Sequence, residues 1–207
     1  MTEQSAIPIY TIGYGDRSID DFIAVLQRYQ IDYVVDVRTA PYSRYKPDFS
    51  KTELSAALRE GGIKYLFMGD QLGGRPTDPA CYTDGKVDYA KVKLTDAYRQ
   101  GIERIGTAFA QQQRIALMCS EGKPEQCHRS KLIGETLTQL AIPLIHIDEA
   151  DAAQSQEAVI ARLTDGQLSL FDDHAFHSRK RYQPHRRDPN ATEAHENDDY
   201  SDNHDDA

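Results

Sequence analysis

The residues best suited to chemistry gather in a turn rich in Gly and Pro, at Cys119, Glu121, Cys127, His128 and Arg129. This turn joins a short apolar run to a helical pattern, so its spacing predicts that Cys119 lies near a helix N-terminus. There the helix dipole and free backbone N–H groups favour an anion, either a thiolate or a charged ligand. A thiolate is a nucleophile, and Glu121 or His128 would transfer the proton. The plainer alternative makes Cys119 a small buried residue at a strand end.

A metal site formed by Cys119, Cys127 and His128 is an alternative that the spacing does not favour. Zinc sites commonly use C-x-x-C pairs, and neighbours on a helix such as Cys127 and His128 would point in different directions. We therefore predict no cofactor, and a divalent metal stays the alternative. His146, in the last predicted strand, is expected to be a hydrogen-bonded core residue.

Two other segments place polar residues directly after a predicted strand. They contain Asp36, Arg38, Ser43 and Arg44 in the first, and Gly73, Gly74 and Arg75 in the second. Hydroxyl and guanidinium donors suit phosphate or carboxylate recognition, so these segments and Arg129 are predicted to bind an anionic substrate, with Asp36 among the catalytic groups. The alternatives are that Asp36 pairs internally with Arg38 and that the glycines only form a turn.

Strand and helix patterns alternate along the chain. Strands are predicted at 7–12, 33–37, 63–68, 115–118 and 143–147, with helix-start patterns at Ser18 and Ser50 and further helices near 89–112, 125–140 and 155–163. Such alternation predicts an α/β fold over residues 1–165, with a mostly parallel sheet of about five strands and helices on both faces. Ligands of such sheets bind beyond the carboxyl ends of the strands, so the three polar segments are expected to meet at one edge. The long connection 69–87 is rich in Gly, Pro and Asp.

Charge is unevenly distributed along the sequence. The formal net charge is −9, but seven acids follow Asn190 without any Lys or Arg, so the rest of the chain is nearly neutral. The charge therefore does not exclude a nucleic-acid partner. No basic leader precedes an apolar core and no apolar run is long enough to span a membrane, so no membrane partner is expected. Three cysteines are too few for a disulfide framework, which predicts a cytoplasmic protein with reduced thiols.

Four motifs stand out together: Thr11-Ile12-Gly13-Tyr14, Asp36-Val37-Arg38 with Pro41 and Ser43-Arg44, Leu72-Gly73-Gly74, and C-x-E-x-x-P-x-x-C-H-R from Cys119 to Arg129. As a set they resemble the family catalogued as domain of unknown function 488, over about Ile9 to Ile147. This resemblance implies a fold and a map of site residues, but no reaction. The layout is also distantly similar to rhodanese-like and cysteine-phosphatase domains. The chain departs from the phosphatases in the spacing between cysteine and arginine, so their mechanism is not transferred.

The segment 166–207 is polar and is predicted to be a disordered tail. It contains Gln167, Leu168, Ser169, Leu170 and Phe171, which resemble the pentapeptide that binds the bacterial DNA sliding clamp. That resemblance implies that Leu and Phe side chains enter a groove on the clamp. The alternative is that these apolar residues fold back onto the domain. A basic cluster within 179–187 could contact the DNA backbone.

Three functions stay open at this point. The first is an enzyme, such as a hydrolase, that acts on nucleic acid or a nucleotide-like phosphate substrate and is recruited to DNA by the sliding clamp. The second is a thiol-dependent enzyme of sulfur or phosphate transfer, with Cys119 as the nucleophile. The third is a non-enzymatic adaptor that binds the clamp and nucleic acid. The polar residues at the strand ends favour the first.

Overall fold

The computed structural model describes residues 6–163, 177–178 and 181–182. The strands of its main sheet are β1 (Ile9–Gly13), β2 (Tyr33–Asp36), β3 (Lys64–Phe67), β6 (Ile115–Cys119), β7 (Leu144–Ile147) and β8 (Ala153–Ser155). They lie in the order β3-β2-β6-β1-β7-β8, and β8 alone pairs antiparallel. The predicted α/β fold with a mostly parallel sheet is confirmed. The edge strand β8, of three residues, was not predicted from the sequence.

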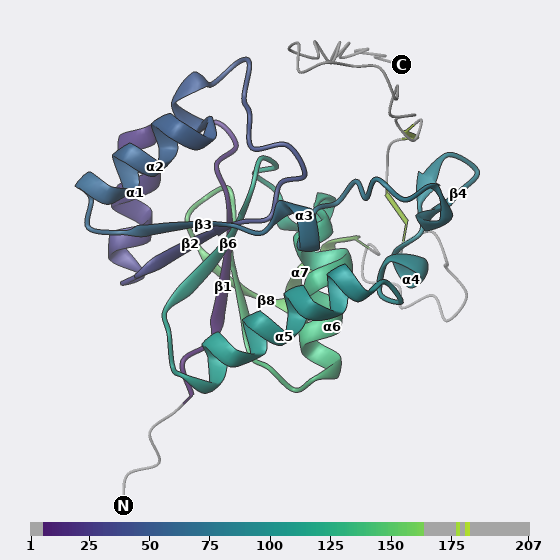
Figure 1. The fold of residues 1–207 in the computed structure, drawn as a ribbon. Coiled ribbons are helices and arrows are strands. Elements are labelled where there is room, and N and C mark those ends of the chain that lie inside the picture. The colour runs from purple at the N-terminus through teal and green to yellow at the C-terminus, as the bar shows by residue number, and fades with distance from the viewer. Residues whose placement is uncertain (1–5, 164–176, 179–180, 183–207) are drawn as a thin grey trace, which may run out of the picture.

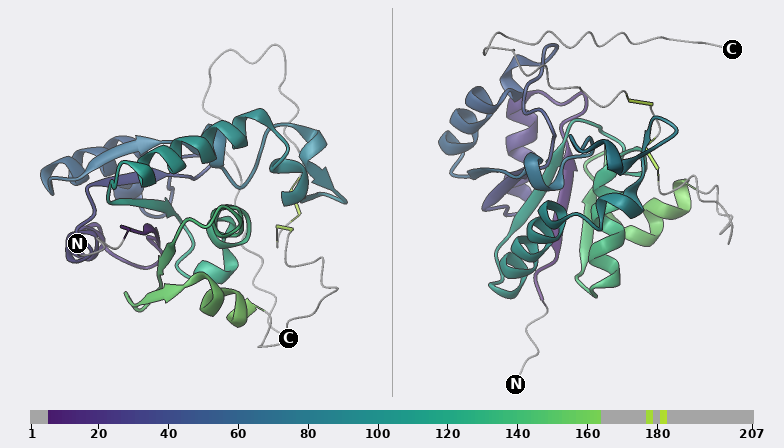
Figure 2. Two further views of the ribbon diagram at one scale, coloured as in Figure 1. Left: turned by 90° about the horizontal axis from the view of Figure 1, so that it is seen from below. Right: turned by 45° about the vertical axis from the view of Figure 1, so that its right-hand side comes forward.

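Helices cover both faces of this sheet (Figures 1 and 2). The helices α1 (Ile19–Arg28) and α2 (Lys51–Glu60) lie on one face, and α5 (Asp96–Ala110) and α6 (Glu135–Gln139) lie on the other. The last helix, α7 (Gln156–Leu163), packs against β7 and the turns before α6. In the described part of the chain, no helix combines the length and the apolar character needed to cross a membrane.

The two faces of the sheet carry separate hydrophobic cores. Leu117 and Cys119 of β6 pack in the core under α5 and α6, whereas Met118 packs in the core under α1 and α2. Successive side chains of a strand point to opposite faces, which accounts for this division. Asp36 pairs with Met118 in the register of β2 and β6, while the next residue, Val37, belongs to the same core as Cys119. The strand ends therefore present two chemical environments, one on each face.

Serine hydroxyls at the two predicted helix starts behave differently. The Ser18 hydroxyl accepts a hydrogen bond from the Asp21 backbone N–H and caps α1 as predicted. Ser50 precedes α2 but its side chain makes no capping bond. Its hydroxyl instead accepts a hydrogen bond from the Ser43 backbone N–H at 3.2 Å. Ser50 thus fixes the loop that follows β2 rather than the first turn of α2.

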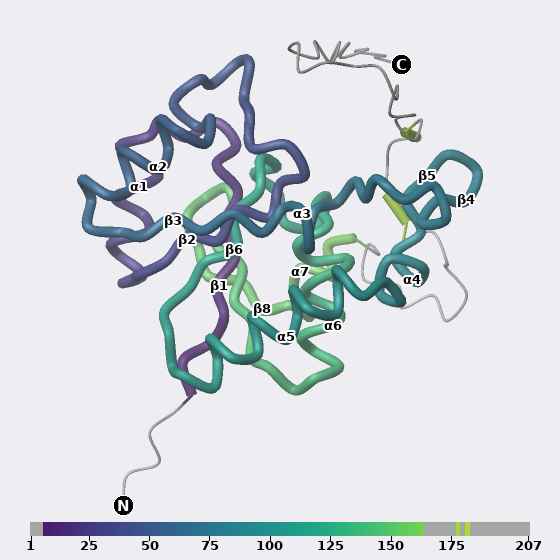
Figure 3. Tube along the Cα trace, viewed as in Figure 1, coloured from purple at the N-terminus to yellow at the C-terminus, as the bar shows by residue number. Residues whose placement is uncertain are grey.

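The long connection after β3 is structured. It contains α3 (Gly69–Leu72), a 3₁₀ turn (Pro79–Cys81), a hairpin of β4 (Tyr82–Thr83) and β5 (Lys86–Val87), and then α4 (Tyr89–Val92). Figure 3 shows the hairpin and α4 projecting beside the main sheet. Asp84 and Gly85 both have positive φ, as a two-residue hairpin turn requires. Ser178 and Tyr182, expected in a disordered tail, donate backbone N–H groups to the carbonyls of Val87 and Gly85.

His146 of β7 is fully buried and hydrogen-bonded through both ring nitrogens. Nδ1 lies 2.7 Å from the Thr11 hydroxyl and Nε2 lies 2.6 Å from Oε1 of Gln156. The Gln156 amide nitrogen donates to the Ser130 carbonyl, so its oxygen faces the ring and accepts from Nε2. The predicted core histidine is confirmed. Burial lowers the pKa of His146 to about 4, because the bond to Gln156 does not compensate and the Arg129 charge lowers it further.

This buried histidine makes stability depend on pH. His146 stays neutral in the folded protein, whereas in the unfolded chain it takes up a proton near its ordinary value of 6.5. Its contribution is therefore complete above that pH and decreases as the pH falls toward 4, by about 3 kcal/mol in total. We expect His146→Gln, which keeps a donor and an acceptor, to reduce this slope. Urea unfolding of both proteins across this pH range tests it, and equal slopes would contradict the assignment.

Candidate active site

Four side chains meet beyond the end of β6 and form what we call the thiol centre: Cys119, Glu121, Cys127 and His128. The Cys119 thiol donates to Oε2 of Glu121 at 3.1 Å. Nδ1 of His128 lies 3.8 Å from the Cys119 sulfur and 3.6 Å from the Cys127 sulfur. Both cysteines and His128 are buried. Three of these residues were predicted to be catalytic, and Cys127 was considered only as a metal ligand.

Cys127 and His128 both face Cys119 because the predicted helix 125–140 is interrupted. A 3₁₀ turn over Pro124–Gln126 ends at Cys127, whose backbone is extended with φ −112° and ψ 151°. A π-helical segment, Arg129–Gly134, then leads into α6. The expectation that Cys127 and His128 diverge on a helix was therefore wrong, since they precede it. Helical segments of the π type are often found at functional sites.

The ring of His128 connects the thiol centre to two other loops. Its Nε2 lies 3.1 Å from the Val37 carbonyl, and since a carbonyl only accepts, Nε2 carries the hydrogen. Gly74 packs directly on the ring, and a Cβ at that position would lie 2.8 Å from Cγ of His128. The predicted meeting of the loops after β2, β3 and β6 at one edge is confirmed. Gly74 serves close packing, beyond the turn that a glycine pair alone would indicate.

Arg129 holds the loop that carries Glu121. Its guanidinium is fully buried, and Nη2 donates to the carbonyls of Glu121 at 2.9 Å and Gly122 at 2.7 Å. Nη1 lies 3.4 Å from the Thr11 hydroxyl. Arg129 was predicted to bind substrate, but these contacts make it a positioning residue for Glu121. Gly13 belongs to the same arrangement, because a Cβ there would overlap the Glu121 carbonyl.

The pKa shifts in the thiol centre differ from the sequence prediction. A hydrogen bond to Cys127, followed by burial, raises the pKa of the Cys119 thiol well above its usual value. This direction is opposite to the lowered thiol pKa expected near a helix N-terminus, because the Cys127 contact and burial both disfavour the charged form. Burial also acts to raise the pKa of Glu121, but the Cys119 hydrogen bond and the His128 charge lower it overall. Burial acts to lower the pKa of His128, yet Cys119 and Glu121 raise it overall.

Asp36 and Arg38 form a second cluster on the opposite face of the sheet. Both Asp36 carboxylate oxygens accept from the Arg38 guanidinium, at 2.9 and 2.6 Å, and Tyr65 donates to Oδ2 at 2.7 Å. Asp36 is completely buried and Arg38 is 5% exposed. Among the described residues, Nη1 of Arg38 has no hydrogen-bond partner, and its guanidinium lies over the Tyr14 ring. The internal pairing considered as the plainer alternative is the one observed.

The loop after β2 presents aromatic and basic side chains to solvent. Tyr42 is 72% exposed and Tyr45 is 73% exposed, and Arg44 between them is also exposed. Ser43, predicted to contact substrate, is instead buried, and its hydroxyl accepts from Tyr14 at 3.3 Å and from the Lys46 backbone N–H. Only Arg44 of the four predicted residues in this segment is open to a ligand. Neither tyrosine was predicted as a site residue, although the sequence shows both of them close to Arg44 and Lys46.

Arg75 and Gly73 lie in the loop after α3. The Arg75 backbone N–H donates to the Thr39 hydroxyl at 3.0 Å, and its guanidinium lies 4.9 Å from the centroid of the Tyr182 ring. A Cβ at Gly73 would lie 2.6 Å from the Thr39 hydroxyl and 3.0 Å from the Thr39 Cα, so this glycine permits a close approach of the loops after α3 and β2. The loop thus joins the site edge to the segment that contains Tyr182.

Tyr89, at the start of α4, is a further residue that sequence reasoning missed. It is buried, and its pKa is raised above the ordinary range by burial first and then by Cys127, Tyr182, Glu121 and Cys119. Its phenol therefore belongs to the surroundings of the thiol centre. No motif indicated it, because it is distant in sequence and follows the hairpin.

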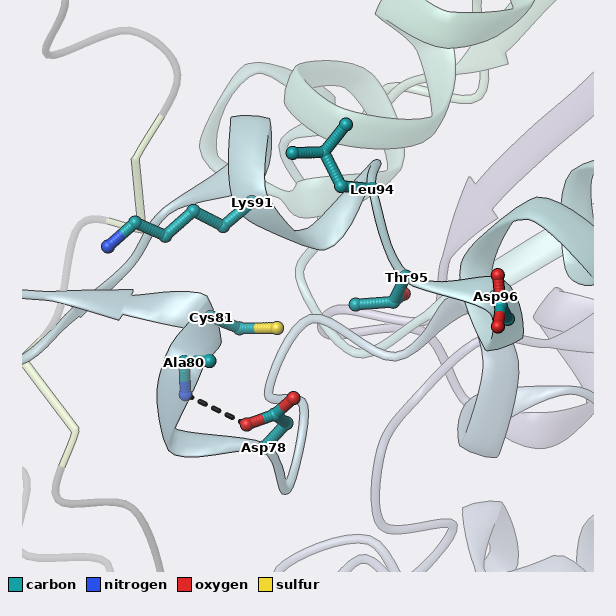
Figure 4. Close-up of a pocket in the computed structure, with 7 residues that line it drawn as sticks. All are labelled: Asp78, Ala80, Cys81, Lys91, Leu94, Thr95 and Asp96. Atoms are coloured by element: carbon teal, nitrogen blue, oxygen red, sulfur yellow. Dashed lines mark hydrogen bonds between the residues drawn. The ribbon is translucent and has the colours of Figure 1, made fainter.

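A separate open hollow of about 600 Å³ lies beside the 3₁₀ turn and α4 (Figure 4). Its lining residues are Asp78, Ala80, Cys81, Lys91, Leu94, Thr95 and Asp96. Asp78 accepts from the Ala80 backbone N–H, and burial raises the pKa of the Cys81 thiol. This hollow does not include the thiol centre, and the Asp78 carboxylate in its lining raises the pKa of the Cys81 thiol further.

The thiol centre lies where the connections of the sheet change direction. The chain leaves β1 through α1 on one face, and leaves the neighbouring β6 through α6 on the other. Ligands of open α/β sheets bind at such a switch point, beyond the carboxyl ends of the strands. The chain is thus an open α/β protein with a thiol, carboxylate and imidazole centre at its switch point.

Within that class, the chain belongs to the family described as domain of unknown function DUF488, whose sequence profile matches residues 18–135. This range is more than half of the 207 residues and includes the thiol centre, Asp36 and Arg38. It is shorter than the resemblance suggested and leaves out the motif at Thr11–Tyr14. No curated protein and no solved structure matches the chain.

Proposed function

We propose that this protein is a cytoplasmic enzyme that acts on nucleic acid or a nucleotide-like phosphate substrate at the thiol centre, and that the sliding clamp recruits it to DNA. One observation supports the substrate class more than any other. The exposed Tyr42 and Tyr45 flank Arg44 in the loop after β2, the same connection whose Val37 carbonyl contacts His128 of the thiol centre. This loop rises beyond the carboxyl ends of the strands in Figure 1.

Aromatic side chains this exposed are suited to stacking on unpaired bases. Stacking on a Tyr contributes about 1–3 kcal/mol per base and tolerates any sequence, while a neighbouring Arg contacts phosphate. Arg44 and Lys46 supply that charge, and the Lys46 ammonium is held near the loop by the Arg17 carbonyl at 2.8 Å. The geometry therefore suits single-stranded substrate, or a base displaced from a duplex, better than an intact double helix.

Glu121 and His128 supply the proton-transfer groups in this proposal. The lowered pKa of Glu121 keeps it a carboxylate, and the raised pKa of His128 favours its protonated form. A carboxylate would accept a proton from a nucleophile and an imidazolium would donate one to a leaving group, which corresponds to hydrolysis. Cys119 stays a thiol between them and serves to hold the Glu121 carboxylate in place.

Recruitment by the clamp depends on residues 167–171, which lie outside the described residues. Its support is the sequence match of Gln167, Leu168, Ser169, Leu170 and Phe171 to the clamp-binding pentapeptide. Short peptides of this kind bind with affinities of about micromolar, which is sufficient to raise the local concentration of the enzyme at DNA.

The stacking loop gives the first functional prediction. Replacing both Tyr42 and Tyr45 by Ala should weaken binding of a single-stranded oligonucleotide at least about tenfold, because each stacked base loses about 1–3 kcal/mol. Fluorescence anisotropy with a labelled oligonucleotide measures this. Leu140→Ala is the matched control, since Leu140 is an exposed apolar residue at the end of α6. Equal affinities of the double variant and wild type would remove the observation on which the substrate class depends.

Glu121 gives the prediction for catalysis. Product formation from single-stranded and duplex oligonucleotides, with and without abasic sites and terminal phosphates, can be followed on denaturing gels. Glu121→Gln keeps the size of the side chain but cannot accept a proton, so activity should fall by about a hundredfold or more. Glu149→Gln, at an exposed carboxylate after β7, should retain full activity. An active Glu121→Gln protein would exclude Glu121 as the base.

Clamp recruitment is tested by a pull-down with purified bacterial sliding clamp. Wild-type protein should be retained, and the double variant Leu170→Ala, Phe171→Ala should lose most of the binding because both apolar anchors are gone. Replacement of Asp172 and Asp173 by Asn is the control, since these residues follow the pentapeptide. Retention of the double variant at the wild-type level would show that the pentapeptide has no such role.

A further inference from the structure

The two sulfurs and the imidazole nitrogen of the thiol centre are arranged as metal ligands. The Sγ atoms of Cys119 and Cys127 and one ring nitrogen of His128 all lie within 4.8 Å of one another. A tetrahedral zinc ion with Zn–S near 2.3 Å and Zn–N near 2.0–2.1 Å separates a sulfur and a nitrogen ligand by about 3.5 Å. The distances from Nδ1 to the two sulfurs, 3.8 and 3.6 Å, are close to this value.

The orientation of the imidazole fits metal binding as well. Because Nε2 donates its hydrogen to the Val37 carbonyl, Nδ1 is the nitrogen whose lone pair faces the two sulfurs. Histidine ligands of metals commonly donate their second ring N–H to a carbonyl or carboxylate, which fixes the ring. Here the Val37 carbonyl is that acceptor, and the close packing of Gly74 limits rotation of the His128 ring.

The backbone places the ligands without rearrangement. Cys119 ends a strand in the middle of the sheet, and Cys127 and His128 occupy the interruption between the 3₁₀ turn and the π-helical segment. Glu121 extends the set, since its Oε2 lies 3.1 Å from the Cys119 sulfur. Two sulfurs, one nitrogen and a nearby carboxylate oxygen are ligand types that zinc accepts, and soft thiolates disfavour Mg²⁺ and Ca²⁺.

We propose that Cys119, Cys127 and His128 bind one zinc ion through both Sγ atoms and Nδ1, with Glu121 beside the fourth position. On binding, the two thiols lose their protons to solvent and the sulfurs become thiolate ligands. The inference goes beyond the proposed function and is measured without any substrate. In the zinc-bound protein His128 is a ligand through an unprotonated Nδ1, so of the two proton-transfer groups only Glu121 remains.

Zinc content of the full chain tests the proposal. Protein reduced with a phosphine, stripped with a chelator and then incubated with zinc chloride should retain one zinc ion per chain after desalting, as measured by mass spectrometry of the metal. Cobalt(II) in place of zinc should give the thiolate-to-cobalt absorption in the near ultraviolet. Cys127→Ser should lose most of the zinc and of this absorption. Cys81→Ser is the matched control, because Cys81 is equally buried but lies outside the thiol centre.

Thermal unfolding keeps the result interpretable if a variant folds poorly. Zinc should raise the melting temperature of wild type and Cys81→Ser, since a ligand that binds only the folded state stabilises it, and should leave Cys127→Ser unchanged. Wild-type protein that is folded by circular dichroism but retains only a trace of zinc and shows no cobalt spectrum would overturn the proposal. Cys127→Ser that retains one zinc ion per chain would overturn it equally.

Discussion

The buried guanidinium of Arg129 is the interaction on which the geometry of the site depends. It is among the largest fully buried side chains, and its hydrogen-bond acceptors are the carbonyls of Glu121 and Gly122 and the Thr11 hydroxyl. An isolated charge is strongly disfavoured in a protein interior, so these contacts must be retained once the chain is folded. They bind the loop that carries Glu121 to the end of β1. Loss of Arg129 would leave the partly buried carbonyls of Glu121 and Gly122 without this donor, at a cost of up to about 1–3 kcal/mol each.

The alternation of side chains along β2 and β6 determines which residues can act together. Asp36 points to the face of α1 and α2, while Cys119 and Val37 belong to the other core. The two acids of the predicted site, Asp36 and Glu121, therefore have different neighbours and make different contacts. Asp36 forms an ion pair with Arg38, whereas Glu121 accepts a hydrogen bond from the Cys119 thiol. Arg44 is exposed to solvent, whereas Arg38 and Arg129 are engaged inside the protein.

Much of the fold could be predicted from the sequence because apolar runs of strand length alternate with amphipathic helices. The convergence of the loops after β2, β3 and β6 followed from parallel topology alone. The orientation of Cys127 and His128 could not be predicted in the same way. Pro124 begins a short 3₁₀ turn that ends at Cys127, whose backbone is extended. The helical pattern of apolar residues gives no sign of this interruption. The buried Cys119 of the plainer alternative is the one observed, and its contact with Cys127 together with this burial shifts the thiol pKa opposite to the expected direction.

The chemistry of Cys119 depends on whether a metal ion takes the place of its thiol proton. As a buried thiol it donates to Glu121, and burial together with Cys127 opposes ionisation, which argues against a free nucleophile. A dication between the two sulfurs would change this balance, since a coordinated thiol is deprotonated by the metal charge. With such an ion bound, both cysteines would be ligands and neither would be a nucleophile. Glu121 would no longer accept the hydrogen bond from the Cys119 thiol, so its carboxylate would be free to accept another proton. Covalent sulfur transfer would need one accessible thiolate, which two buried and adjacent cysteines do not provide.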